Sequence, residues 1–312
     1  MAYLPKLNPT VGGGLGGLPT RAAGGAGVPV RGEVIFTLSG SSTWIVPEGV
    51  TSICAVCVGS GSGSSFDIDN NNTYVGGAGG GLAWVNDIAV TAGDSLSMFI
   101  GQRGFSVAQS TFTYAAASAI FNGGEARLTV GGTIVCRASG GSISSGLVGT
   151  GGAALVGAGG SGGGTTSTTS ETSGGGAGGY SGNGANGITG TTSTAGGAGS
   201  GGGGGSGAIS GNVTSSAGGG GVGLFGEGAS GGATGVPSNL YEAFGGNGGS
   251  GGESGTSRPP TVATSNSRSP LHAGNYGGGA GCSAGLSYAG GGAIRILWGK
   301  GRAFPSTDVG QS

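Results

Sequence analysis

Charge, histidine and long apolar runs are all scarce in this sequence. Charged residues make up 7% of the 312 residues, and the formal net charge is −1. That balance is typical neither of a nucleic-acid surface nor of a protein attracted to an anionic membrane. The longest apolar stretch, Ile53–Val58, is far too short to span a bilayer, and the chain begins without a signal-peptide pattern. We therefore expect a protein that is made in a cytoplasm, binds no nucleic acid and inserts into no membrane.

Residues that perform catalysis or hold metals are also few. The only histidine, His272, has no aspartate nearby in the sequence, so a Ser-His-Asp triad is not indicated. Cys54 and Cys57 have the spacing of a zinc or redox pair, but they lie in an apolar run typical of a strand, where residues three apart point to opposite faces. The stretch Asp67–Asn72 alternates like a calcium loop yet lacks that loop's glycine and terminal glutamate. The favoured interpretation is no enzyme, no metal and no cofactor, with the cysteines as small buried residues.

Glycine, in contrast, supplies 86 residues and recurs in a register of three in the second half of the chain. Gly245–Glu253 is a run of successive Gly-Gly-X units, and Gly184, Gly187 and Gly190 keep the same spacing. A period of three belongs to neither an α-helix nor a pleated strand; it is the repeat of the polyproline II helix. Because such a helix has no internal hydrogen bonds, its peptide groups must pair with neighbouring helices or with water. The pattern predicts a bundle of glycine-rich polyproline II helices over residues 142–293.

Between residues 32 and 141 the apolar period changes to two. Val34 and Phe36 alternate with polar residues, and short apolar runs separated by turn signals such as Gly131–Gly132 continue to Cys136. Such a series of short strands predicts an antiparallel β-sandwich or jelly roll. The expected core consists of Phe36, Trp44, Val56, Trp84, Met98, Leu128 and Ile134.

The two ends of the chain complete this all-β organisation. Residues 1–31 combine prolines with glycines and too few apolar residues for a core, so we expect an extended arm that docks on a partner or folds along the protein's own surface. The alternative is a loosely held terminus. Ala293–Trp298 is a strand pattern that follows the last glycine tract and is expected to return to the sandwich. The predicted division is an arm (1–31), a β-sandwich (32–141), a glycine-rich bundle (142–293) and a C-terminal strand with its tail (294–312).

Several motifs within this frame resemble a known family. The stretch Thr43–Ser52 reads TWIVPEGVTS and looks like the first motif of the glycine-rich domain of bacteriophage tail proteins. Further pieces follow in the family's order at Gly76–Val85, Thr91–Asp94 and Leu96–Gly101. Ala126–Thr133 and Gly292–Gly299 are similar to recurring pieces of phage structural proteins, notably those of cyanophages. The resemblance covers roughly Glu33 to Gly141 and the C-terminal end of the chain.

The glycine-rich half is similar in kind to the adhesins at the tips of T-even-like long tail fibres. In those adhesins a stack of polyproline II helices displays loops that touch the host receptor. The resemblance implies a virion protein, assembled in the host cytoplasm, that recognises a host surface polysaccharide or an outer-membrane protein. It further implies docking to other virion proteins, for which the N-terminal arm is suited, and a homo-oligomer is possible.

The links Pro237–Phe244 and Thr256–Tyr276 are the longest breaks in the glycine pattern, and they collect aromatic and cationic residues of the kind that dominates recognition surfaces. The expected receptor-binding residues are Tyr241, Phe244, Arg258, Arg268, His272 and Tyr276. The alternative is that these residues cap the helix stack. The alternative function is a capsid decoration or tail-assembly protein with no receptor role. A third, an ice-binding protein, is disfavoured because the Thr/Ser links are not repeated in register.

Overall fold

The computed structural model describes residues 31–67, 73–106, 121–144, 148–166, 172–188, 195–207, 216–235, 243–257, 271–282 and 287–305. Within these ranges the chain forms antiparallel sheets and irregular glycine-rich segments but no helical element, which confirms the expected all-β class. It follows that none of these ranges contains a helix able to cross a bilayer. The expected N-terminal arm lies, apart from Arg31, outside the described residues.

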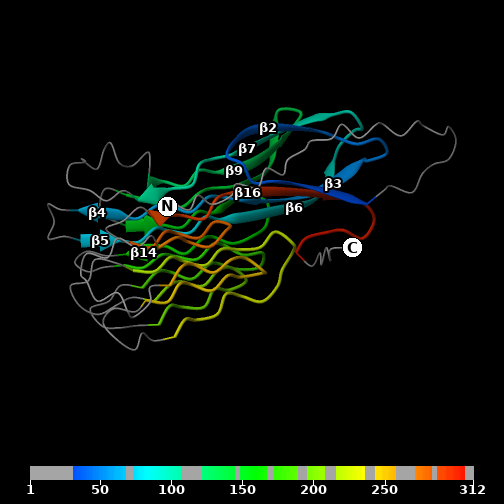
Figure 1. The fold of residues 1–312 in the computed structure, drawn as a ribbon. Coiled ribbons are helices and arrows are strands. Elements are labelled where there is room, and N and C mark those ends of the chain that lie inside the picture. The colour runs from blue at the N-terminus through cyan, green and yellow to red at the C-terminus, as the bar shows by residue number, and fades with distance from the viewer. Residues whose placement is uncertain are drawn as a thin grey trace, which may run out of the picture.

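Two antiparallel sheets form the upper part of the molecule in Figure 1. The four-stranded sheet has the order β1 (Gly32–Phe36), β16 (Ala293–Trp298), β3 (Ser52–Val58) and β6 (Leu82–Ala89). The five-stranded sheet has the order β13 (Ala154–Val156), β10 (Thr133–Ala138), β9 (Ala126–Val130), β7 (Ser95–Ile100) and β2 (Gly40–Ile45).

Short strands lie beside the glycine-rich segments. Three of them form one small sheet: β11 (Ser142–Ile143), β12 (Val148–Thr150) and β14 (Thr165–Thr166). Two further pairs are β8 (Phe105–Ser106) with β15 (Ser287–Tyr288), and β4 (Ser65–Asp67) with β5 (Thr73–Val75).

The C-terminal strand lies inside the four-stranded sheet. β16 pairs antiparallel with β1 on one side and with β3 on the other, so that Ile294 is opposite both Phe36 and Cys57. The expected strand at Ala293–Trp298, returning to the first strands of the chain, is therefore confirmed. In the sequence, the glycine-rich segments of the second half of the chain therefore lie between β6 and β16, two strands of the same sheet.

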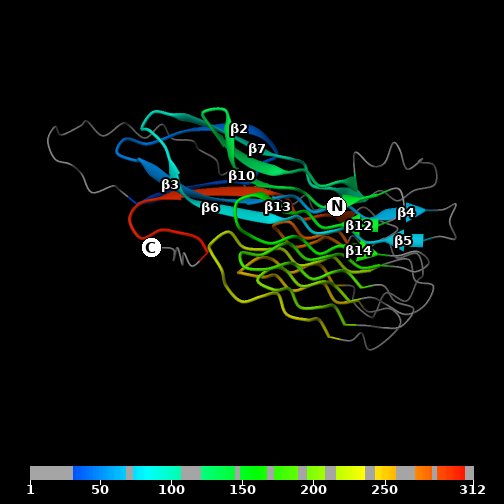
Figure 2. The ribbon, with the colours of Figure 1, turned by 180° about the vertical axis from the view of Figure 1, so that it is seen from behind.

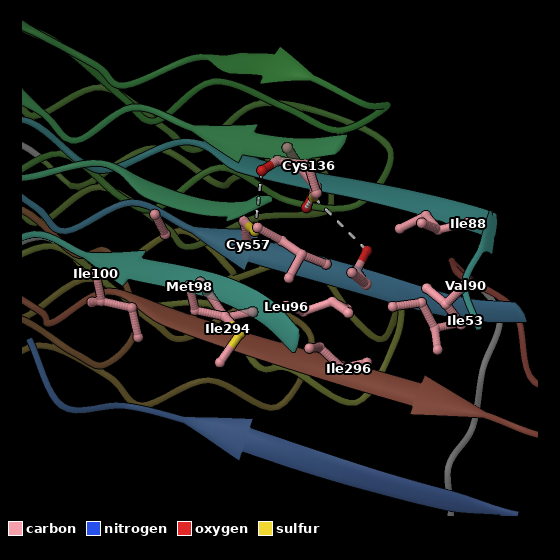
Figure 3. Close-up of a cluster of buried hydrophobic side chains, with 14 of the residues drawn as sticks. Ile53, Cys57, Ile88, Val90, Leu96, Met98, Ile100, Cys136, Ile294 and Ile296 are labelled. Atoms are coloured by element: carbon pink, nitrogen blue, oxygen red, sulfur yellow. Dashed lines mark hydrogen bonds between the residues drawn. The ribbon is translucent and has the colours of Figure 1, made fainter. Parts of the chain in front are cut away.

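Side chains from the facing surfaces of the two large sheets share one hydrophobic cluster. Figure 3 shows Leu96 and Met98 of β7 directed toward Ile294 and Ile296 of β16. The Cys57 thiol donates to the Cys136 carbonyl at 3.7 Å, and burial raises the pKa of this thiol. Of the expected core, Met98 and Leu128 are buried here, and Phe36 and Trp44 pack against the cluster half-buried.

The prediction of a single core is wrong for Val56 and Trp84. Both belong to a second cluster on the opposite face of the four-stranded sheet, where the glycine-rich segments contribute Tyr180 and Leu224. β3 is covered on both faces, which explains its continuous apolar run. Cys54 and Cys57 accordingly lie in different clusters, on opposite faces of β3, as the spacing predicted. Ile134, also expected in the core, is half-buried and outside both clusters.

The glycine-rich segments bond to one another with a period of three residues. In the segment 173–179, the amides of residues 174 and 177 donate to the segment 216–223, and those of 175 and 178 donate to 76–81. The amides of residues 173 and 176 donate to a third neighbour, 182–188, and these bonds are 2.8–3.1 Å long. Successive peptide groups therefore point to three different neighbours, so each central segment is bonded on three sides.

The sheets and the glycine-rich segments are continuous. β3 runs into the segment 59–64, and the segments 76–81 and 287–292 lead into β6 and β16. Hydrogen bonds cross the expected boundary at residue 141, since the Gly175 amide donates to the Gly77 carbonyl at 2.9 Å. Figures 1 and 2 show the resulting layers, in which the four-stranded sheet lies between the five-stranded sheet and the lower glycine-rich segments.

A buried arginine connects these layers. Arg295 of β16 is fully buried, and its Nη1 donates to the Leu224 carbonyl at 2.9 Å. Its guanidinium lies 4.6 Å from the centre of the Phe225 ring and 2.5 Å from Oε2 of Glu33. Arg302 contacts the same carboxylate oxygen at 2.6 Å. Glu33 thus joins β1, β16 and the C-terminal segment.

We predict that the free energy of unfolding decreases in acid through Glu33 and Glu125, which each bind two arginines. Burial raises the pKa of both carboxyls. The hydrogen bonds and charges of the arginines lower it by a larger amount, so the pKa of each carboxyl lies below its ordinary value. Stabilisation is therefore complete above about pH 4.5 and is lost as pH falls through the folded-state pKa. Denaturant unfolding between pH 7 and pH 3 should show this decrease. A Glu33→Gln/Glu125→Gln double variant should show a flatter profile, and an unchanged profile would contradict the assignment.

Candidate functional site

The two ends of the glycine-rich segments differ. At one end, which we call the turn end, the segments are joined by tight turns at residues 180–182, 200–202, 224–226, 249–252 and 275–277. At the other, which we call the link end, the described segments stop at longer sequence links: 167–171, 189–194, 208–215, 236–242 and 258–270. The link end is on the left in Figure 1, beside β4 and β5.

Buried hydroxyl groups join the segments at the link end. The Ser64 amide donates to Ser106 Oγ at 2.8 Å, and the two hydroxyls are 2.6 Å apart. Ser216 Oγ donates to the Thr172 carbonyl at 2.7 Å and accepts from the Cys282 amide at 3.1 Å. We call this set the hydroxyl layer; its members are Ser64, Ser106, Thr172, Ser173, Ser206, Ser216 and Ser287.

The hydroxyl layer has a physical cause. Where a glycine-rich segment ends, its peptide groups lose their neighbours, and a buried peptide group without a partner costs about 1–3 kcal/mol. Serine and threonine supply a donor and an acceptor in little space. Among the described residues, the only buried side-chain nitrogen or oxygen without a partner is Nε of Arg295, far from this layer on β16. The layer therefore fixes Thr172, Ser216 and Leu271, which flank the links 167–171, 208–215 and 258–270, by hydrogen bonds.

An aromatic and cationic cluster lies against the link end. β8 and β15 pair so that Phe105 is opposite Tyr288, with ring centres 6.4 Å apart. The Arg103 guanidinium lies 4.5 Å from the centre of the Tyr288 ring, and His272 stacks on the same ring at 5.2 Å. Arg103 is exposed, and the three rings are half-buried. This combination is typical of recognition surfaces, so we take the four residues as the candidate binding cluster.

His272 is held in its neutral form within this cluster. Its Nδ1 accepts a hydrogen bond from the Tyr288 amide at 3.0 Å, which requires an unprotonated Nδ1. Burial lowers the pKa of His272, and the positive charge of Arg103 lowers it further. The ring therefore contributes a flat apolar face at neutral pH. Its contacts are those of a packing residue.

The other expected receptor-binding residues are placed differently. The Phe244 carbonyl accepts from the Gly207 amide at 3.0 Å, and its half-buried ring lies near Gly235. Tyr276 lies at the turn end, where its amide and carbonyl both bond to Val222 and its ring packs against the second cluster. The structure thus does not place Tyr276 beside His272. Tyr241, Arg258 and Arg268 lie outside the described residues.

Sequence reasoning missed Arg103, Phe105 and Tyr288. They come from β8, the segment that precedes it, and β15, which is far from both in the chain, and they carry no shared motif. The local signal for Tyr288 is only an aromatic residue in a glycine-rich region. The pairing of β8 with β15 brings these residues to His272.

Comparisons with known proteins identify no family for this chain. No protein-family model matches the chain, and no curated protein has a significant match to it. In the described part of the chain, no group of three or more histidine, cysteine or acidic side chains is placed to hold a metal ion.

Proposed function

We propose that the chain is a bacteriophage virion protein, a tail-fibre or tail-tip adhesin that recognises the host surface through the link end. The phage-like motifs at Thr43–Ser52 and Gly292–Gly299 support the virion assignment. In this proposal the two large sheets form a β-sandwich, and the glycine-rich segments are polyproline II helices. The shared cluster of the sheets supports the first inference, and the three-residue bonding period supports the second.

One observation supports a role in recognition above all. Thr172, Ser216 and Leu271, which flank three of the links, are hydrogen-bonded within or to the hydroxyl layer, whereas tight turns join the segments at the turn end. An ordered base of this kind reduces the entropy lost when a loop binds its target. The Arg103, Phe105, His272 and Tyr288 cluster adds recognition side chains beside the same end.

The position of the first described residues fits the same proposal. β1 begins at Gly32, which is paired with Trp298 at the end of β16 that is remote from the link end. Nη1 of Arg302 donates to the Gly32 carbonyl at 2.6 Å and holds this junction. The N-terminal arm is thus attached opposite the link end, which suits docking to another virion protein while the links face the host.

The test is to replace residues 236–242 and 258–270 by Gly/Ser sequence of equal length, leaving Phe244, His272 and the hydroxyl layer in place. We expect adsorption of virions carrying the variant chain to host cells to fall by at least about tenfold, as a loss of hot-spot contacts does. The melting temperature of the purified chain should be unchanged. The same replacement of 189–194, which is already polar and small, is the matched control and should leave adsorption unchanged.

Two results would refute the adhesin proposal. One is unchanged adsorption in the variant with both links replaced. The other is location of the chain on the capsid shell in a map of the virion, which would favour the decoration protein. A tail location combined with unchanged adsorption would favour a tail-assembly role.

A further inference from the structure

The outer face of the five-stranded sheet contains a hollow of about 340 Å³ over β2, β7 and β9. This face is turned away from the glycine-rich segments, at the top of Figure 1. Since Met98 and Leu128 point into the core, the adjacent residues on their strands point outward. The volume lies within the usual range of small-ligand sites, about 300–1,000 Å³.

The strand register arranges the lining in two rows. Thr43 is opposite Ser97, which is opposite Thr129, and these short side chains place hydroxyl groups along one row. In the second row Phe99 is opposite Arg127, whose guanidinium lies 4.7 Å from the centre of the ring. The short side chains of the first row leave the hollow open, and Phe99 and Arg127 form its border.

The charge at this hollow is positive. Glu125 is shared by Arg127 and Arg137, so two guanidinium groups face one carboxylate. Arg127 contacts Glu125 through Nη1, and no hydrogen bond joins its Nη2 or Nε to another described residue. Its side chain is 37% exposed and lines the hollow, so the guanidinium is accessible to a ligand there.

We propose that this hollow binds a carboxylate-bearing sugar unit of an acidic polysaccharide. The free edge of Arg127 would pair with the carboxylate, since a guanidinium presents parallel N–H groups to carboxylate oxygens. The hydroxyls of Thr43, Ser97 and Thr129 would bond to sugar hydroxyls. A protein partner is less favoured because serine is depleted at protein interfaces. The proposed host-surface role supplies only the source of the polysaccharide; the hollow is separate from the link end.

The test is titration calorimetry of the full chain with oligogalacturonate, and with maltohexaose as a neutral control. We expect the acidic oligomer alone to bind, more weakly at higher salt because the interaction is electrostatic. Arg127→Gln should weaken binding by about tenfold, as loss of a charge-assisted hydrogen bond does. Ser97→Val fills the hollow at an exposed strand position, keeps every charge and should weaken binding similarly. Lys300→Gln, an equal loss of charge on the exposed turn that follows β16, should not.

The proposal is overturned if the acidic oligomer does not bind, if maltohexaose binds equally well, or if Lys300→Gln weakens binding as much as Arg127→Gln. If Arg127→Gln fails to fold, judged by circular dichroism, Ser97→Val alone decides. If the chain does not bind oligogalacturonate and virions carrying Arg127→Gln or Ser97→Val fail to assemble, this face would be assigned to a protein partner instead. The chain with both links replaced should still bind oligogalacturonate, so failure of the adhesin proposal is distinguishable from failure of this one.

Discussion

Replacing Gly220 by alanine is expected to destabilise the protein by about 3 kcal/mol, the upper part of the usual range for overpacking. A Cβ atom at this position would lie 2.0 Å from the Asn247 carbonyl oxygen and 2.5 Å from its carbon. Neither atom belongs to a flexible side chain, so the two segments would have to separate. Separation would disturb the bonds between them, from the Gly246 amide to the Gly218 carbonyl and from the Gly249 amide to the Gly221 carbonyl.

Gly232→Ala is the matched control for this substitution. A Cβ atom there would meet only the Asn247 side chain, at 3.7 Å, and the residue is exposed. The change should be neutral or should stabilise by up to about 1 kcal/mol, because alanine restricts the unfolded chain more than glycine does. Denaturant unfolding of both variants measures the difference. Equal stability of the two would show that close contact between segments does not hold this region together.

The sequence alone predicted the elements whose signals are local. The alternation of residues 126–136 around Gly131–Gly132 corresponds to β9, a tight turn and β10, and both glycines have positive φ (54° and 83°). The apolar strand at residues 293–298 was also recognisable. What the apolar run of β3 could not show is which face each residue occupies, because both faces are covered. Val56 was for this reason assigned to the wrong cluster.

The candidate site was less accessible from the sequence. His272 was noticed because it is the only histidine, but its partners Arg103 and Tyr288 reach it through the pairing of β8 with β15. Tyr276 was grouped with His272 because the two are close in sequence. An extended segment advances about 3 Å per residue, so four residues carry the chain well away from the link end to the turn end. Proximity in sequence is therefore a poor guide to shared position in such a segment.

Glu33→Gln is the second substitution with a large expected effect, a loss of about 2 kcal/mol. Breaking a buried ion pair costs about 3–5 kcal/mol because one charge remains buried without its partner. Here Arg295 is 0% and Arg302 is 11% exposed, whereas Glu33 is 38% exposed, so solvent screening reduces the cost. Denaturant unfolding at pH 7 measures it. If the stranded charge is the cause, adding Arg295→Met should recover part of the loss.

Glu125→Gln is the control that isolates the contribution of arginine burial to this loss of stability. Glu125 also binds two arginines, but Arg127 and Arg137 are 37% and 38% exposed. Water can solvate both guanidinium groups once the carboxylate is neutralised, so we expect a loss of only about 0–1 kcal/mol, the range for surface pairs. Equal losses in the two glutamine variants would contradict the role of the buried Arg295. A further loss on adding Arg295→Met to Glu33→Gln would instead assign the stabilisation to the contacts of Arg295 with Leu224 and Phe225.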